Sequence, residues 1–199
     1  MPDNFSKIKP VTDSIKRPLW SIIIPTYNCA NYLKETLESV LAQYPGPEKM
    51  EIIVVDDHST KDDPEQVVNE FGEGKVKFIR QPTNVGKSKN YETGLNVSKG
   101  LYIHLLHGDD MVNEGFYPKM EELFIQFPEA GAAFCQCNYI DAVGNIKQQT
   151  GKEIPQDGII PNWLEKIATW QRVQPPSIVF KREVYEKIGG YNLQLQYME

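Results

Sequence analysis

Residues 102–110 read YIHLLHGDD, an apolar run that ends in a glycine and two adjacent carboxylates. Such a run is typical of a strand that is buried on both faces of a parallel sheet. Residues 51–60, EIIVVDDHST, repeat this pattern of a buried strand followed by an acidic pair. Because ligands of open α/β sheets bind outside the carboxyl ends of the strands, we expect both acidic pairs to lie at one ligand-binding edge.

Strands and helices alternate over the first two thirds of the chain. Buried-type runs predict strands over residues 20–25, 52–55, 76–80 and 101–106. Apolar residues at helical spacing, with proline or glycine near their ends, predict helices over residues 32–43, 64–71, 88–97 and 115–127. This order belongs to the α/β class and predicts a Rossmann-like, mostly parallel sheet with helices on both faces.

The last third of the chain is less regular. It predicts, in order, a strand-like run over 132–139, a hairpin turn at 141–145, an irregular polar segment over 147–161, a short helix over 163–170, a strand over 177–181 and a helix over 182–188. The 199 residues contain no repeat and no Gly/Ser linker, and this length suits one domain. We therefore expect an N-terminal arm at 1–19 and a single domain at 20–199.

The composition argues against several classes of protein. A net charge of −6 is unlike that of a nucleic-acid binder, and no apolar run approaches the roughly 18 residues of a membrane span. Residues 1–18 lack the apolar core of a signal peptide. The three cysteines, an odd number without zinc-finger spacing, are typical of a reducing cytoplasm. Two of them, Cys135 and Cys137, are expected to pack in the core.

The motif Pro25-Thr26-Tyr27-Asn28, which follows the first predicted strand, has two interpretations. In one it is a plain strand-to-helix turn, with Asn28 or Asn31 as the cap of the helix. In the other it is the floor of a pocket for a planar base, on which Tyr27 stacks while backbone groups bond the edge of the base.

The acidic pair Asp56-Asp57 follows the second predicted strand. One interpretation is a turn and capping signal, with His58 exposed in the turn. The alternative is a carboxylate that accepts a hydrogen bond from the imide N–H of uracil or from a ribose hydroxyl.

Lys87 and Lys89 lie in the first turn of a predicted helix. The positive end of the helix dipole disfavours lysines there, and a bound anion would reverse that effect. The motif therefore favours a phosphate site, with a solvated basic turn as the alternative.

His107, Asp109 and Asp110 end the fourth predicted strand. Adjacent carboxylates at a buried edge raise each other's pKa unless a cation compensates their charge. Carboxylate and phosphate oxygens suit Mg²⁺ or Mn²⁺, and the histidine favours Mn²⁺ slightly. In the alternative interpretation, Asp110 or Asn113 caps the helix that follows.

Five motifs, in order, resemble those of the family 2 glycosyltransferases of GT-A fold. They are SIIIPTYN, EIIVVDDHST, NVGKSKNYETGL, GLYIHLLHGDDM and IGGYN, and they extend from about residue 20 to near the end of the chain. The resemblance implies an enzyme that binds a nucleotide-diphospho sugar, with UDP as the expected nucleotide, through Mn²⁺ or Mg²⁺. It implies transfer of the sugar, with inversion, to a saccharide or glycolipid hydroxyl in surface polysaccharide or glycoconjugate synthesis.

The resemblance also implies roles for individual residues. The residues expected to contact the nucleotide sugar are Pro25, Thr26, Tyr27, Asn28, Asp56, Asp57, Lys87, Asn90 and Asp109. Those expected to bind the metal are His107, Asp109 and Asp110. The donor-binding half would cover about 20–112 and the acceptor half about 113–199. In the acceptor half, Trp163, Trp170 and residues 172–177 are candidates for contact with the acceptor, and the alternative is that both tryptophans are core anchors.

Two departures from the family pattern concern chemistry. In this family the acidic motif usually has the pattern Asp-x-Asp-Asp, and His107 occupies the position of its first aspartate. The family's catalytic base is an aspartate in a Glu-Asp pair that follows a Gly-Gly-aromatic segment, here Gly189-Gly190-Tyr191. The sequence ends at Glu199, so we expect either a C-terminal truncation within this pair or Glu199 itself as the base.

Two other functions are compatible with the motifs. A nucleotidyltransferase of similar fold would also bind phosphates through a metal, although residues 26–31 lack the glycine- and basic-rich loop usual for that class. A non-catalytic nucleotide-binding module is the other alternative. We expect a cytoplasmic protein without a transmembrane segment, with peripheral attachment to the inner face of the membrane as an option. The oligomeric state is open.

Overall fold

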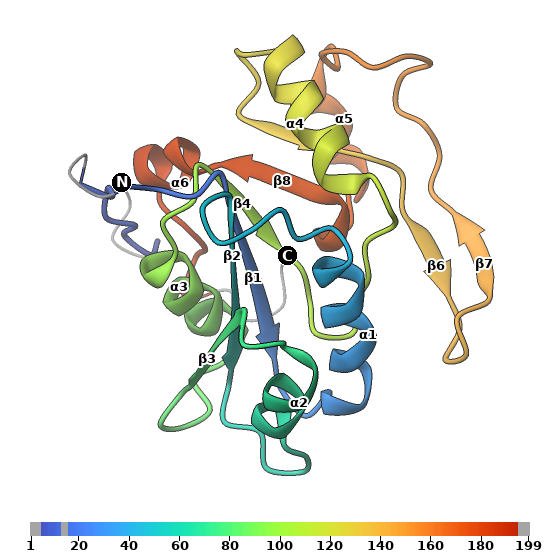
Figure 1. Cartoon of the computed structure of the whole chain (residues 1–199). Coiled ribbons are helices and arrows are strands. Elements are labelled where there is room, and N and C mark those ends of the chain that lie inside the picture. Colours follow the sequence, from blue (N-terminus) through green and yellow to red (C-terminus); the bar gives the residue numbers. More distant parts are fainter. Residues whose placement is uncertain (1–4, 13–15, 195–199) are drawn as a thin grey trace.

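The computed structural model describes residues 5–12 and 16–194 of the chain (Figure 1). The strands are β1 (Trp20–Thr26), β2 (Met50–Asp56), β3 (Val76–Arg80), β4 (Tyr102–Leu105), β5 (Ala132–Phe134), β6 (Asn138–Ile140), β7 (Ile146–Gln149) and β8 (Ile178–Lys181). The helices are α1 (Ala30–Leu41), α2 (Pro64–Phe71), α3 (Lys87–Val97), α4 (Phe116–Gln126), α5 (Trp163–Thr169) and α6 (Arg182–Ile188). A short 3₁₀ helix, η1 (Pro175–Ser177), precedes β8.

The main sheet has the strand order β3-β2-β1-β4-β8-β5. The strands β3, β2, β1 and β4 are parallel to one another, whereas β8 runs antiparallel to both β4 and β5. The carboxyl ends of β1, β2 and β4 therefore lie along one edge, as the prediction of a mostly parallel α/β sheet requires.

Alternating side chains of β1 supply a core on each face of the sheet. Ile22 and Ile24 pack with buried residues of α1, α2 and α4, whereas Ile23 packs with buried residues of α3 and α6. Figure 1 shows these two groups of helices on opposite sides of the sheet. The predicted arrangement of helices on both faces is confirmed. Among the described residues, no helix is both long enough and apolar enough to span a membrane.

The segment after β5 differs from its prediction. The run over 132–139 is interrupted, because β5 ends at Phe134 and β6 begins only at Asn138. Cys135 is exposed and Cys137 is half-buried between these strands, so the expectation that both cysteines pack in the core is wrong. The hairpin turn at 141–145 is confirmed, but β7 occupies the start of the segment that was expected to be irregular.

The described part of the N-terminal segment lies against the domain. Phe5 forms an antiparallel bridge with Asn192, and the Ser6 backbone exchanges hydrogen bonds with Tyr191 and Gly190. Ile8 is buried in the core on the α3 side of the sheet. Residues 5–8 are therefore docked on the domain rather than extended away from it.

His104 is a fully buried histidine on β4, and its effect on the free energy of unfolding depends on pH. Its ring nitrogens contact Tyr117 Oη at 3.3 Å and the Pro176 carbonyl oxygen at 3.0 Å. Burial lowers its pKa from 6.5 to about 4. The unfolded chain therefore binds a proton that the folded chain excludes, so folding stability falls as the pH drops from 6.5 toward 4.

We predict that His104→Gln reduces this acid sensitivity. The stability advantage of wild type over the variant should shrink by about 2 kcal/mol between pH 7 and pH 5. Urea unfolding of both proteins at the two pH values measures this difference. An advantage that stays constant with pH would contradict the assignment.

Candidate functional site

The loops after β1, β2 and β4 lie side by side at the carboxyl edge of the sheet. The Asp57 N–H donates to the Thr26 carbonyl oxygen at 2.9 Å, and the Gly108 N–H donates to the Pro25 carbonyl oxygen at 3.2 Å. A Cβ at Gly108 would come within 2.7 Å of Thr26 Cγ2, so only glycine allows this close approach. The predicted acidic pairs are therefore brought to one edge.

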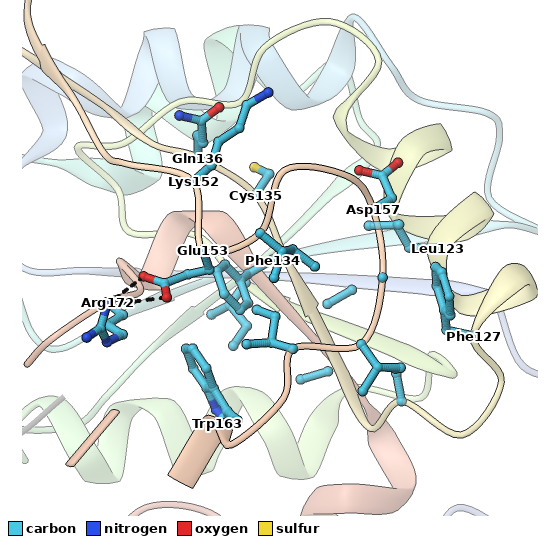
Figure 2. Close-up of a pocket in the computed structure, with 18 of the residues that line it drawn as sticks. Leu123, Phe127, Phe134, Cys135, Gln136, Lys152, Glu153, Asp157, Trp163 and Arg172 are labelled. Carbon is cyan, nitrogen blue, oxygen red and sulfur yellow. Dashed lines mark hydrogen bonds and ion pairs between the residues drawn. The ribbon is translucent and has the colours of Figure 1, made fainter. Parts of the chain in front are cut away.

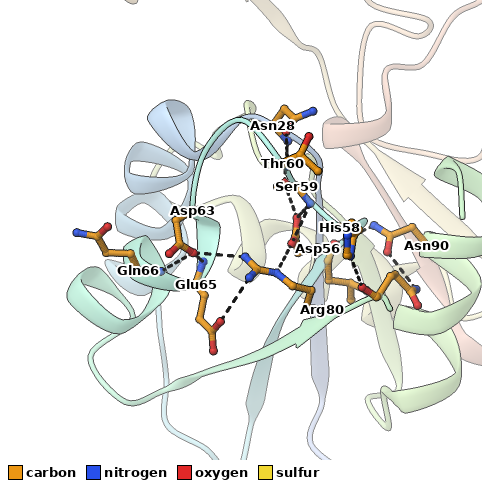
Figure 3. Close-up of polar contacts among 12 residues, drawn as sticks. Asn28, Asp56, His58, Ser59, Thr60, Asp63, Glu65, Gln66, Arg80 and Asn90 are labelled. Atoms are coloured by element: carbon orange, nitrogen blue, oxygen red, sulfur yellow. Dashed lines mark hydrogen bonds and ion pairs between the residues drawn. The ribbon is translucent and has the colours of Figure 1, made fainter. Parts of the chain in front are cut away.

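Asn28 joins the loop after β1 to the loop after β2. Its Oδ1 accepts hydrogen bonds from the Thr60 and Lys61 N–H groups, at 2.9 and 3.0 Å. Its own N–H donates to Ser59 Oγ at 2.8 Å, and its φ is +53° (Figure 3). Cys29 occupies the N-cap position of α1 without a side-chain cap bond, so the interpretation of Asn28 or Asn31 as the cap is wrong.

The neighbouring residues of this motif differ in exposure. Pro25 and Thr26 are buried, and the Thr26 hydroxyl makes no hydrogen bond to any described residue. The Tyr27 side chain is 49% exposed. Of the three residues, only Tyr27 presents a large surface on which a planar ligand can stack.

Asp56 is completely buried in an ion pair (Figure 3). Its Oδ2 accepts a 2.8 Å hydrogen bond from Arg80 Nε, and its Oδ1 accepts the Ser59 hydroxyl at 2.5 Å. Arg80 also contacts Asp63, which caps α2. These contacts show Asp56 stabilising the loop after β2, and its predicted contact with a nucleotide stays a prediction.

Asp57 connects β2 to the start of α3. Its two carboxylate oxygens accept the N–H groups of Val85 and Gly86, at 2.7 and 2.9 Å. Burial raises its pKa, and these two hydrogen bonds oppose the shift. Asp57 therefore fixes the position of Lys87, the exposed first residue of α3.

Asn90 and His58 both bond to the backbone around these loops (Figure 3). Asn90 is buried, its Nδ2 donates to the Val55 carbonyl oxygen at 2.8 Å, and its Oδ1 accepts from Gln81 Nε2 at 3.3 Å. His58 is half-buried rather than exposed, with its Nδ1 3.1 Å from the Gln81 carbonyl oxygen. The predicted contact of Asn90 with a diphosphate stays a prediction.

His107, Asp109 and Asp110 form a compact group of metal-ligand side chains. One potential ligand atom from each residue lies within 4.8 Å of the others. The helix that follows begins at Phe116 after Gly115, with no side-chain cap bond, so the interpretation of Asp110 as a helix cap is wrong. The same finding excludes Asn113 as the cap.

The charges of this group favour a cation. Burial, and then the neighbouring Asp109, raise the pKa of Asp110 to about 6. Burial, and then Lys87, lower the pKa of His107, which keeps its imidazole neutral. A divalent cation would offset the repulsion between the carboxylates. Two carboxylates suit Mn²⁺ or Mg²⁺, and a neutral imidazole beside them favours Mn²⁺. The residues present therefore fit the predicted metal.

Sequence reasoning missed two residues that support the site. Arg80 neutralises Asp56 from the end of β3, and the Tyr91 hydroxyl lies 2.7 Å from Nε2 of His107. Arg80 follows an ordinary strand pattern, which carries no signal of a partner. Tyr91 stands within the quoted motif NVGKSKNYETGL, but a buried aromatic residue on a helix indicates core packing by itself.

A pocket of about 560 Å³ lies in the second half of the chain (Figure 2). The rings of Phe134 and Trp163 lie 5.2 Å apart on its apolar wall. Glu153 lines it and accepts a 3.0 Å hydrogen bond from Arg172 Nη1. Trp170, the other tryptophan predicted near an acceptor, is 73% exposed and does not line the pocket.

Glu199, the predicted catalytic base, lies outside the described residues.

Comparison with known proteins agrees with these observations. The sequence model described as "Glycosyl transferase family 2" matches residues 21–189. The chain belongs to glycosyltransferase family 2. Among curated relatives, an uncharacterized glycosyltransferase of Rickettsia typhi is 40% identical over 191 residues, which cover 90% of this chain and 55% of that protein. An uncharacterized glycosyltransferase of Mycoplasma genitalium is 29% identical, over 69% of this chain and 50% of that protein.

The family 2 chain spans about half the length of these curated relatives. A further relative is the minor teichoic acid biosynthesis protein GgaB of Bacillus subtilis, which is 34% identical over 53% of this chain and 12% of its own length.

Solved structures share the fold of this family 2 chain. TarS of S. aureus in complex with UDP superposes with a TM-score of 0.68 at 21% identity, over 89% of this chain and 51% of that chain. The mannosyltransferase PcManGT of Pyrobaculum calidifontis, in complex with GDP-Man and Mn²⁺, gives a TM-score of 0.65 at 20% identity, over 96% and 52% of the two chains. The GT-A fold implied by the sequence motifs is confirmed.

Proposed function

We propose that the protein binds a UDP-linked sugar through a divalent cation at the carboxyl edge of its sheet. We propose further that it transfers the sugar, with inversion, to a saccharide or glycolipid hydroxyl. The grouping of His107, Asp109 and Asp110 within 4.8 Å, on a family 2 fold, carries this proposal. Two solved structures of the same fold support the ligand classes, because TarS has been solved with UDP and PcManGT with GDP-Man and Mn²⁺.

In this proposal His107, Asp109 and Asp110 hold Mn²⁺ or Mg²⁺. When bound, the cation supplies positive charge that stabilises the departing diphosphate. Lys87 adds a second positive charge at the start of α3, where a helix N-terminus favours anions. The exposed ring of Tyr27 stacks on the base, and the Asp57 carboxylate bonds its imide N–H or the ribose.

Inversion requires a carboxylate that takes the proton of the acceptor hydroxyl on the face opposite the leaving group. The assignment of this role to Glu199, like the division into a donor half and an acceptor half, stays a prediction.

We assign part of the acceptor to the pocket lined by Phe134, Trp163 and Glu153, because its volume lies in the range of ligand pockets. A sugar ring stacked on Trp163 would use the aromatic face of the pocket.

We predict that Trp163→Ala raises the KM for a saccharide acceptor about fivefold, because an aromatic contact contributes about 1 kcal/mol beyond its area. The KM for the donor should not change. Trp170→Ala is the matched control, since Trp170 is exposed and lies outside the pocket. Equal effects of the two substitutions on the acceptor KM would contradict this assignment.

NMR of the reaction products tests the proposed function itself. With a UDP-sugar, Mn²⁺ and an acceptor, ³¹P spectra should show release of UDP, and ¹H spectra should show an inverted anomeric centre. Attack on phosphorus, as in a nucleotidyltransferase, would instead release the sugar 1-phosphate. Binding of UDP-sugars without release of UDP from any of them would indicate a nucleotide-binding module.

A further inference from the structure

Tyr91 makes the closest described contact with the imidazole of His107. Its Oη lies 2.7 Å from His107 Nε2, and the two rings are nearly parallel, with centroids 5.8 Å apart and an interplanar angle of 23°. The other ring nitrogen, Nδ1, lies 3.7 Å from Asp110 Oδ2. Nε2 thus faces Tyr91 on α3, and Nδ1 faces the carboxylate of Asp110.

The position of the imidazole proton decides whether His107 can bind a cation. A neutral imidazole has a proton on one nitrogen and a lone pair on the other. If Nε2 holds the proton and donates it to the Tyr91 oxygen, the Nδ1 lone pair faces Asp110. If Tyr91 instead donates to Nε2, the proton lies on Nδ1, and that atom cannot be a ligand.

We propose that Tyr91 is a positioning residue of the metal site, whose hydroxyl oxygen accepts the Nε2–H of His107 and so keeps the Nδ1 lone pair directed toward the carboxylates. This inference rests on the proposed function, in which His107 is a ligand. Metal-binding histidines usually donate their second N–H to an oxygen acceptor, most often a carboxylate, a backbone carbonyl or water, which fixes both the tautomer and the ring orientation. The Tyr91 hydroxyl oxygen would be the acceptor here.

The packing around Tyr91 gives it a fixed place. Tyr91 is 4% exposed on α3, and its ring meets the edge of Tyr191 with centroids 5.0 Å apart. Tyr191 in turn packs against Tyr185 of α6. Lys87 lies one helical turn before Tyr91, and its charge acts on His107 as well. One helix therefore positions both the lysine and the tyrosine beside the predicted metal ligand.

Binding of Mn²⁺ alone, followed by electron paramagnetic resonance, tests this role without any assay of activity. Tyr91→Phe should weaken Mn²⁺ binding by about tenfold, the lower end of the range for residues that support a ligand. Tyr191→Phe is the matched control, because it removes a hydroxyl from the same aromatic cluster, in which the Tyr191 ring packs against Tyr91 and Tyr185. In a His107→Asp background, Tyr91→Phe should have no effect, because a carboxylate has no tautomer to select.

The tautomer is measured directly on the metal-free wild-type protein by long-range ¹H–¹⁵N NMR of its histidines. We expect the proton of His107 on Nε2 in wild type and a mixture of tautomers in Tyr91→Phe. A proton on Nδ1 in wild type would overturn the inference, even if the variant failed to fold.

Different results would overturn the metal site and the role of Tyr91. If His107→Ala binds Mn²⁺ as tightly as wild type does, His107 is not a ligand, and the proposed metal site is wrong. If His107→Ala weakens Mn²⁺ binding and Tyr91→Phe does not, the metal site stands and the role of Tyr91 is overturned.

Discussion

Asp110→Asn is expected to abolish Mn²⁺-dependent binding of UDP while the fold remains intact. The Asp110 side chain is 37% exposed, and its carboxylate lies 3.7 Å from His107 Nδ1 at the edge of the sheet, so its replacement leaves the core unchanged. In wild type, UDP with Mn²⁺ at 100 times the dissociation constant should add about 2.7 kcal/mol of stability. Thermal unfolding with and without ligand should show this gain in wild type and none in the variant.

The control for this experiment is Glu122→Gln, which removes one negative charge from the surface of α4. Glu122 is 60% exposed and interacts with Lys119. The Glu122→Gln variant should be stabilised by UDP and Mn²⁺ to the same extent as wild type. If Asp110→Asn keeps that stabilisation, Asp110 does not hold the cation.

Asp57→Ala is expected to weaken binding of uridine in the absence of metal by 10- to 100-fold. A hydrogen bond to a charged group contributes about 1.5–3 kcal/mol, which corresponds to that range. The substitution also removes the acceptor of the Val85 and Gly86 N–H groups, so the start of α3 loses its tie to β2. Calorimetric titration with uridine measures the effect.

Asp110→Asn provides the comparison for Asp57→Ala, because uridine lacks the diphosphate that a cation would contact. It should leave metal-free uridine binding unchanged. Equal uridine affinity of Asp57→Ala and wild type would remove Asp57 from the proposed base pocket.

Local sequence patterns predicted most of the main sheet and its helices. The bounds of α2, β3 and α6 agree with their predictions to the residue, because proline, glycine and buried periodicity mark their ends. The hairpin of β6 and β7 was harder to predict. Tyr139 and Ile140 of β6 are exposed, so no buried face imposes the alternation by which a strand is recognised.

The candidate site could be predicted only in part, because neighbours in sequence diverge in space. Asp56 and Asp57 are adjacent, yet Arg80 binds the first and the start of α3 binds the second. Arg80 lies 24 residues after Asp56, and His107 lies 16 residues after Tyr91. Local sequence patterns do not encode these tertiary pairings, whereas the acidic pairs at the strand ends follow directly from the parallel sheet.

Calorimetric titration of the wild-type protein with UDP tests the proposed metal site most directly. One titration contains Mn²⁺ and the other contains EDTA. The difference in affinity shows whether the nucleotide binds through a cation, as proposed for His107, Asp109 and Asp110. The proposed site predicts binding in Mn²⁺ and at least a tenfold loss of affinity in EDTA, because the carboxylates would then repel the diphosphate. UDP affinity that is the same with Mn²⁺ and with EDTA, or no UDP binding under either condition, would contradict the proposed site.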